Sequence, residues 1–176
     1  MGEVQVSIDG TPRALPGPFM VIATQNPVEY EGTYPLPGAQ LDRFLMKLVL
    51  PLPERDTEIE GLTRHANGFN PRDLVSAGLQ AVTNAQDLRL ARSEVAKVGV
   101  GPEVTAYIVD LVRATRVSPS LSLGVTPRGA NALLAPSRAW ACVHEPPFVT
   151  PDPVQTLALP TLLHRLKTTS SASPDG

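Results

Sequence analysis

The sequence contains a single cysteine and little charge of either sign. Cys142 has no second cysteine with which to form an internal disulfide, so a reducing cytoplasm is the expected location. Charged residues make up 18% of the chain, and the formal net charge is −2. No global electric field therefore draws the chain to nucleic acid or to an anionic membrane.

Long apolar runs are also missing. The longest, such as residues 19–23, are far shorter than the ~20 residues that a membrane-spanning helix requires. The N-terminal MGEVQVSIDG also lacks a basic segment followed by an apolar one, so we expect no membrane insertion. The three histidines, His65, His144 and His164, are not spaced as metal ligands, and we expect structural roles for them and no metal site.

Apolar residues and prolines are what the chain does contain. With 176 residues, 42% of them hydrophobic, it can bury the core of one ordinary domain or of two small ones. Its 19 prolines are about twice the average usage of roughly 5%, so helices must start and stop often. Only the tail, residues 168–176, has the composition of a disordered segment.

Strand patterns occupy the first part of the chain. The alternation VQVSI, followed by Asp9-Gly10, predicts a β-hairpin over about residues 3–16. The run at 19–24 lacks alternation and is bounded by prolines, which is typical of a strand covered on both faces in a parallel sheet. The run at 44–50 is also strand-like and stops at Pro51. We therefore expect a central strand and a second strand there.

Helical patterns dominate from residue 54 onward. A first helix is expected over 54–66, and further start signals are Asn84, Pro102, Thr126-Pro127 and Thr150-Pro151. Pro136 lies inside the helix that starts at Pro127, where a proline costs about 3 kcal/mol or more, so we expect a kink or a shortened helix. Early strands and late helices predict an α/β segment joined to an all-α bundle.

Asn26 follows the predicted central strand. Ligands of open α/β sheets bind beyond the carboxyl ends of the strands, and an amide there can donate to a phosphate oxygen and accept from the attacking water. The alternative is that Asn26-Pro27 only starts a turn.

Two arginines are candidates for phosphate contact. Arg43 lies among apolar residues, so we expect packed neighbours to hold its guanidinium as a preorganised donor; the alternative is a structural Asp42–Arg43 pairing with its surroundings. Arg128 lies in the first turn of a predicted helix, where its charge opposes the helix dipole. A phosphate or a carboxylate such as Asp110 would offset that charge.

Several motifs of the chain, taken together and in their order, resemble the MoxR family of AAA+ ATPases. They are ATQNP, YPLPGAQLDRF and TPRGANALL, together with YIVDLVRATR at 107–116 and LLHRL at 162–166. The resemblance implies an incomplete AAA+ αβα core over residues 1–72, a helical lid over 73–167, and the disordered tail. It further implies that Asn26 is the sensor-1 residue, Arg43 the arginine finger that reaches a neighbouring subunit's nucleotide, and Arg128 the sensor-2 arginine.

The sequence also departs from the family pattern. No GxxxxGK[ST] P-loop and no acidic magnesium motif occur in the 176 residues, so Met1 has the character of an internal start or a truncation. We expect the chain alone to be inactive toward ATP. His144-Glu-Pro-Pro147 replaces the expected turn of glycine and basic residues before Phe148-Val149.

The function that the resemblance implies is ATP binding and hydrolysis, with Mg²⁺, by a chaperone-like remodeller. Its partners would be copies of itself or full-length homologous subunits in a hexameric ring, and proteins with von Willebrand A-type domains. The alternatives are a non-enzymatic interaction module and a truncated, inactive ATPase remnant. Because the hairpin offers only Arg13 as a base, a nucleic-acid motor is disfavoured.

Overall fold

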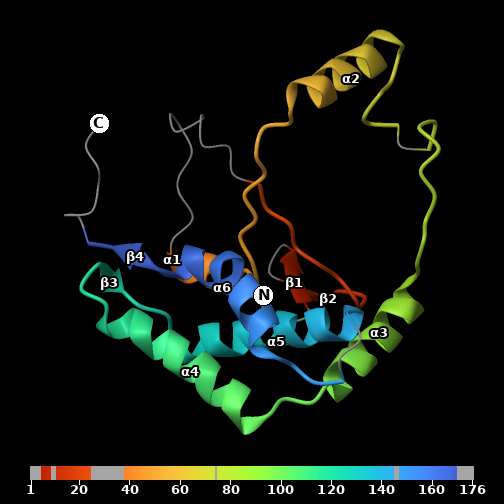
Figure 1. Ribbon diagram of the computed structural model, residues 1–176. Coiled ribbons are helices and arrows are strands. Elements are labelled where there is room, and N and C mark those ends of the chain that lie inside the picture. The colour runs from red at the N-terminus through yellow and green to blue at the C-terminus, as the bar shows by residue number, and fades with distance from the viewer. Residues whose placement is uncertain (1–4, 9–10, 25–37, 74, 145–146, 170–176) are drawn as a thin grey trace.

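The computed structural model describes residues 5–8, 11–24, 38–73, 75–144 and 147–169 (Figure 1). Helices α3 to α6 lie together, whereas α2 stands apart from them on long connections (Figure 1). In chain order the elements are β1 (Gln5–Ile8), β2 (Thr11–Ala14), α1 (Gly38–Leu41), α2 (Arg55–Ala66), α3 (Ala85–Lys97), α4 (Pro102–Val117), β3 (Leu121–Leu123), α5 (Pro127–Val143), α6 (Pro151–Leu162), the 3₁₀ turn η1 (Leu163–Arg165) and β4 (Lys167–Thr168).

The N-terminal hairpin is confirmed. β1 and β2 pair antiparallel, with Ile8 opposite Thr11 and Gln5 opposite Ala14. The expected turn at Asp9-Gly10 itself lies outside the described residues.

The two strands predicted at 19–24 and 44–50 are not formed, and that part of the prediction is wrong. Both runs are irregular, and Met20 and Ile22 are 79% and 76% exposed. A strand of a parallel sheet needs a hydrogen-bonding neighbour on at least one side. The described residues supply none for these two runs, so their apolar side chains stay exposed.

The predicted helix starts are confirmed. Asn84 caps α3, with its side chain accepting from the backbone N–H groups of Gln86 and Asp87, and a proline occupies the first turn of each of α4, α5 and α6. The hydroxyl caps are wrong in detail, because neither Thr126 nor Thr150 makes a side-chain capping bond. The fixed φ of the following proline therefore defines these starts.

Pro136 does not shorten α5, which continues through it to Val143. Leu133, Ser137 and Ala141 on the inner face of the helix are fully buried, and Ser137 Oγ donates to the Leu133 carbonyl at 2.8 Å. Packing of this face against its neighbours therefore compensates for the one N–H that the proline lacks.

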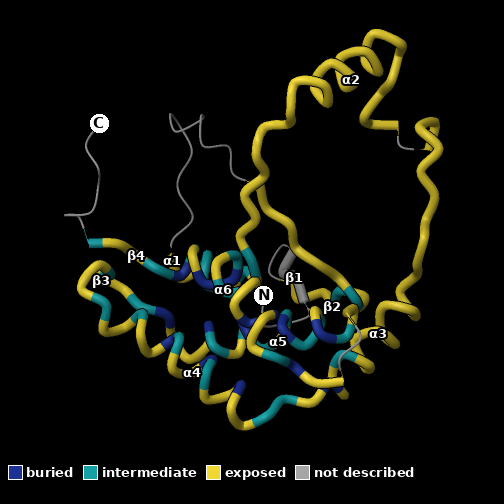
Figure 2. The backbone as a smooth tube through the Cα atoms, viewed as in Figure 1, coloured by how far each residue is buried: buried dark blue, intermediate teal, exposed yellow. Residues whose placement is uncertain are grey.

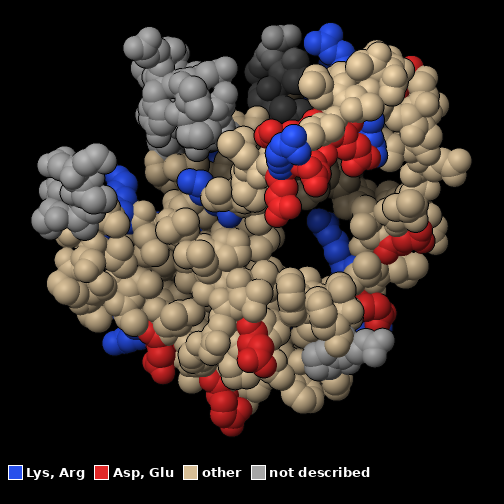
Figure 3. Space-filling view, turned by 45° about the horizontal axis from the view of Figure 1, so that its top comes forward, with Lys and Arg blue, Asp and Glu red and all other residues tan. Residues whose placement is uncertain are grey.

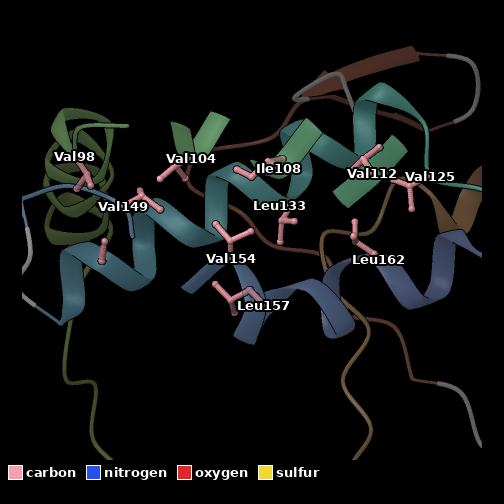
Figure 4. Close-up of a cluster of buried hydrophobic side chains, with 11 residues drawn as sticks. Val98, Val104, Ile108, Val112, Val125, Leu133, Val149, Val154, Leu157 and Leu162 are labelled. Carbon is pink, nitrogen blue, oxygen red and sulfur yellow. The ribbon is translucent and has the colours of Figure 1, made fainter. Parts of the chain in front are cut away.

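The hydrophobic core lies among α4, α5 and α6. Figure 4 shows side chains from the three helices pointing toward one another, and Figure 2 shows the buried residues concentrated in this part of the chain. Each buried side chain of valine or leucine size contributes roughly 1.5–3 kcal/mol. The core consists of Val98, Val104, Ile108, Val112, Val125, Leu133, Ala141, Val149, Val154, Leu157 and Leu162.

Two short β contacts link parts of the helical bundle formed by α3 to α6, which we call the lid bundle. Gly99 and Phe148 form an isolated parallel bridge, which ties the end of α3 to the segment before α6. β3 pairs antiparallel with β4, so Thr168, predicted as the first residue of the disordered tail, lies in a strand. The predicted tail beyond residue 169 lies outside the described residues.

Helix α2 is exposed along its whole length. Acidic and basic side chains are interspersed over it (Figure 3), and Arg64 forms an ion pair with Glu60 one turn away. Among the described residues, no helix combines the length and the hydropathy needed to cross a membrane.

Candidate functional site

The segment that carries Arg43 is a short turn of helix followed by a tight bend. The backbone N–H groups of Asp42, Arg43 and Phe44 donate to the carbonyls of Gly38, Gln40 and Leu41 at 3.0–3.1 Å. Four helical residues are too few to be stable alone, since helix nucleation is unfavourable. The position of this segment must therefore depend on contacts with the rest of the fold.

Asp42 connects this segment to two arginines of the lid bundle. Its Oδ1 lies 3.1 Å from Nε of Arg165, and its Oδ2 lies 4.0 Å from Nη1 of Arg128. The Arg165 side chain is only 3% exposed, whereas that of Arg128 is 65% exposed. One carboxylate thus faces a buried and a solvent-facing guanidinium.

Arg165 makes most of the contacts in this cluster. Its Nη2 donates to the carbonyls of Asp42 at 3.1 Å and Phe44 at 2.8 Å, and its Nη1 donates to the Thr161 carbonyl at 2.7 Å. Burial lowers the pKa of Arg165, and the charge of Asp42 opposes that shift. The guanidinium still remains charged at neutral pH, because arginine is effectively always protonated in proteins.

His164 binds the same segment from the neighbouring position. Its Nε2 lies 3.1 Å from the Phe44 carbonyl and 2.7 Å from Nη1 of Arg165. Burial lowers the pKa of His164, the nearby charges of Arg165 and Lys47 lower it further, and the Phe44 carbonyl and Asp42 oppose the shift. The predicted structural role of this histidine agrees with these contacts.

Gly129 leaves the space that the cluster needs. A Cβ at this position would collide with Cγ1 of Val125 and would lie 3.4 Å from Cδ of Arg165. The glycine of the TPRG motif therefore lets the start of α5 approach the buried arginine, while Arg128 beside it faces solvent.

The structure corrects the expected surroundings of Arg43. We expected packed neighbours to hold its guanidinium, but Arg43 is exposed, and no hydrogen bond or ion pair of its side chain occurs among the described residues. The residue that is held is Asp42, whose partners are Arg165 and Arg128. Arg43 is consequently an exposed side chain on an anchored backbone, without a polar partner in the part of the chain that the structure describes.

The other two predicted site residues differ in what the structure shows. Arg128 does lie in the first turn of its helix, and of the two expected partners, a phosphate or a carboxylate, a carboxylate lies near it; it is Asp42 and not Asp110, which we had named as an example. Asn26 lies outside the described residues. The structure thus brings Arg128 to the segment of Arg43 and does not test Asn26.

The sequence prediction missed Arg165 as the partner of Asp42, and it named a structural pairing of Asp42 with its surroundings only as an alternative. LLHRL was noted only as a family-like ending, and an arginine after a leucine-rich helix end is ordinary in sequence. The Asp-Arg pair in LDRF was a usable signal, because a lone acidic residue among apolar neighbours requires a partner.

Both ends of the chain match known protein families. Residues 1–46 match the family described as "ATPase family associated with various cellular activities (AAA)", and residues 113–176 match the AAA lid domain. The sequence is 35% identical to the chaperone MoxR1 of Mycobacterium tuberculosis over 99% of this chain and 47% of that protein. The chain belongs to the MoxR-type AAA+ ATPases. Its predicted fold class, an AAA+ core segment with a helical lid, is confirmed.

Two further proteins are similar to this MoxR-type chain over nearly its whole length. It is 42% identical over its whole length to the uncharacterized protein YeaC of Bacillus subtilis, of which it covers 53%. The crystal structure of a candidate ATPase from Cytophaga hutchinsonii superposes with a TM-score of 0.83 at 34% identity, covering 96% of this chain and 52% of that one. The chain therefore spans about half the length of the relatives it matches.

Proposed function

We propose that this chain contributes to an ATP-hydrolysing, chaperone-like remodelling assembly, with Arg43 as arginine finger, Arg128 as sensor 2 and Asn26 as sensor 1. One observation carries the proposal: Asp42 is anchored in the lid and contacts Arg128, while the adjacent Arg43 points into solvent with free donors. Arg128 beside Asp42 and Arg43 next to it in the sequence are both exposed, and an exposed guanidinium suits contact with the phosphates of a nucleotide.

The residues present fit part of an ATP·Mg²⁺ site. The exposed guanidinium of Arg128 keeps only a 4.0 Å contact with Asp42, so its donors remain available to an anion. Arg43 is equally available and can stabilise charge on a transferring phosphoryl group. Bound Mg²⁺ would neutralise charge on the phosphates. A P-loop to hold them has no counterpart in the 176 residues and would come from other polypeptide segments of the assembly.

The partners that suit this arrangement are homologous subunits. Because Arg43 projects outward, it suits contact with a nucleotide bound by a neighbouring copy in a ring. Proteins with von Willebrand A-type domains are proposed as clients on the family resemblance alone.

A second candidate function is a non-enzymatic interaction module. It is favoured by the apolar side chains that the unformed strands leave exposed, with Leu48 and Leu50 at 71% and 87%. In that case the exposed residues would bind a partner and Arg43 would have no catalytic role.

The test is a comparison of arginine variants in the native assembly, purified from the source cells through a tag placed after Gly176. The intact masses of the polypeptides in the purified assembly identify the one that carries the P-loop. We expect Arg43→Ala to lower kcat for ATP on the order of 10³-fold or more. Arg113→Ala is the control, because Arg113 is exposed on α4 and has no ion pair among the described residues. Equal turnover in the two variants would reject the finger assignment and favour the interaction module.

A further inference from the structure

We propose that Arg165 is a positioning residue for Arg43, which fastens the finger segment to the helical lid. This proposal rests on the function proposed above and extends it to a residue that never touches the nucleotide. In this arrangement the lid and the finger move as one body.

Arg165 contacts the residues before and after Arg43 in the sequence. The Nη2 group donates to the carbonyl before Arg43, that of Asp42, and to the carbonyl after it, that of Phe44. Nε lies 3.1 Å from the Asp42 carboxylate. A single buried side chain therefore binds the peptide group directly before the exposed arginine and the peptide group that follows Phe44.

The same end of the lid supplies further contacts with this segment. The backbone N–H of Lys47 donates to the Pro160 carbonyl at 2.8 Å, and Nε2 of His164 lies 3.1 Å from the Phe44 carbonyl. The Met46 side chain packs against the lid core. Residues 42–47 are thus docked on the end of α6 and η1.

Arginine is the residue type that this docking requires. Its planar fork can bind a carboxylate and backbone carbonyls at once, whereas lysine presents one compact ammonium group. Arg165 is itself held in place, since Nη1 donates to the Thr161 carbonyl and Gly129 leaves room beside Cδ. The donor group is consequently rigid before the finger segment binds it.

Precise placement matters because an arginine finger acts through geometry. A displacement of about 1 Å in a catalytic constellation can cost roughly 10²-fold in rate. The four-residue helix α1 cannot fix its own position, so loss of Arg165 is expected to let Arg43 move. Arg165 would then affect turnover only while Arg43 is present.

The experiment is a double-mutant cycle in the native assembly, with Arg43→Ala, Arg165→Met, the double variant, and Arg113→Met as the control. We expect Arg165→Met to lower kcat about 10²-fold with a smaller change in KM. In the Arg43→Ala background the same substitution should have no further effect. A loss of the same size in that background would overturn the proposal, because a merely structural role does not depend on Arg43.

Hydrogen exchange provides a second readout that needs no nucleotide. In Arg165→Met we expect faster exchange of the Phe44 and Lys47 amides, with unchanged protection in the middle of α5. Unchanged exchange at both amides would overturn the docking. If α5 also loses protection, Asp42→Asn replaces Arg165→Met in the same cycle, since it removes the charge pair from the side of the finger segment.

The two proposals fail in distinguishable ways. Full turnover in Arg43→Ala would reject the finger and the positioning role that depends on it, whatever exchange shows. Reduced turnover in Arg43→Ala, with additive losses in the cycle or unchanged exchange, would keep the finger and reject Arg165 as its positioning residue.

Discussion

Arg165 and Asp42 are 123 positions apart in the sequence, yet Nε of the arginine lies 3.1 Å from Oδ1 of the aspartate. Arg128 approaches the other oxygen of the same carboxylate at 4.0 Å. The buried arginine determines where the carboxylate lies, and the exposed one remains free to exchange it for another anion. The three residues join the segment that carries Arg43, the start of α5 and the 3₁₀ turn η1.

Arg165→Met should destabilise the chain by about 1–3 kcal/mol. Removal of one partner from a fully buried pair costs roughly 3–5 kcal/mol, but Asp42 is 24% exposed and keeps Arg128 nearby, which reduces the cost. Urea unfolding followed by circular dichroism measures the change. Arg113→Met serves as the control and should stay within about 0.5 kcal/mol of the parent. If both variants unfold at the same urea concentration, the ion pair contributes nothing to stability.

Gly129→Ala should destabilise the lid, although alanine is the better helix former. Alanine normally gains up to about 1 kcal/mol over glycine in a helix, but here its Cβ would collide with Cγ1 of Val125. Overpacking of this kind typically costs 1–3 kcal/mol. Gly61→Ala in α2 is the matched control, because nothing lies within 4 Å of the added Cβ. Thermal unfolding that shifts upward for both substitutions would contradict the predicted collision.

Local signals and long-range contacts explain how far the sequence could predict this structure. Asn84, Pro102 and Pro127 mark helix starts correctly, because capping and proline geometry depend on adjacent residues. The strands predicted at 19–24 and 44–50 failed, because a strand depends on partners elsewhere in the chain.

The site shows the same division. The first-turn position of Arg128 follows from TPRG alone. Spacing could not identify Arg165 as the partner of Asp42, because the two residues lie far apart in the sequence. The exposure of Arg43 was misjudged for the same reason, since its neighbours in sequence are not its neighbours in space.

Stability should fall on acidification through the pH range of histidine titration. Burial lowers the pKa of His164 below its ordinary value of 6.5, so the unfolded chain binds this proton more tightly than the folded one. The contribution is fully present above about pH 6.5 and is lost as the pH falls through the lower folded value. Urea unfolding at pH 8 and pH 5 measures it, and His164→Gln should reduce the difference. An unchanged difference in His164→Gln would assign the pH dependence to other groups.

Arg128→Ala should weaken nucleotide binding without loss of stability. Its side chain is 65% exposed and its ion contact is long, so the substitution should change the free energy of unfolding by less than about 1 kcal/mol. Under the proposed function, loss of a charge-assisted hydrogen bond to phosphate costs about 1.5–3 kcal/mol, or roughly tenfold to hundredfold in Kd. Fluorescent ATP titration of the native assembly measures it against Arg92→Ala, an exposed arginine of α3 without an ion pair among the described residues. Equal affinities would restrict Arg128 to its contact with Asp42, because a residue that binds phosphate cannot be removed without a change in Kd.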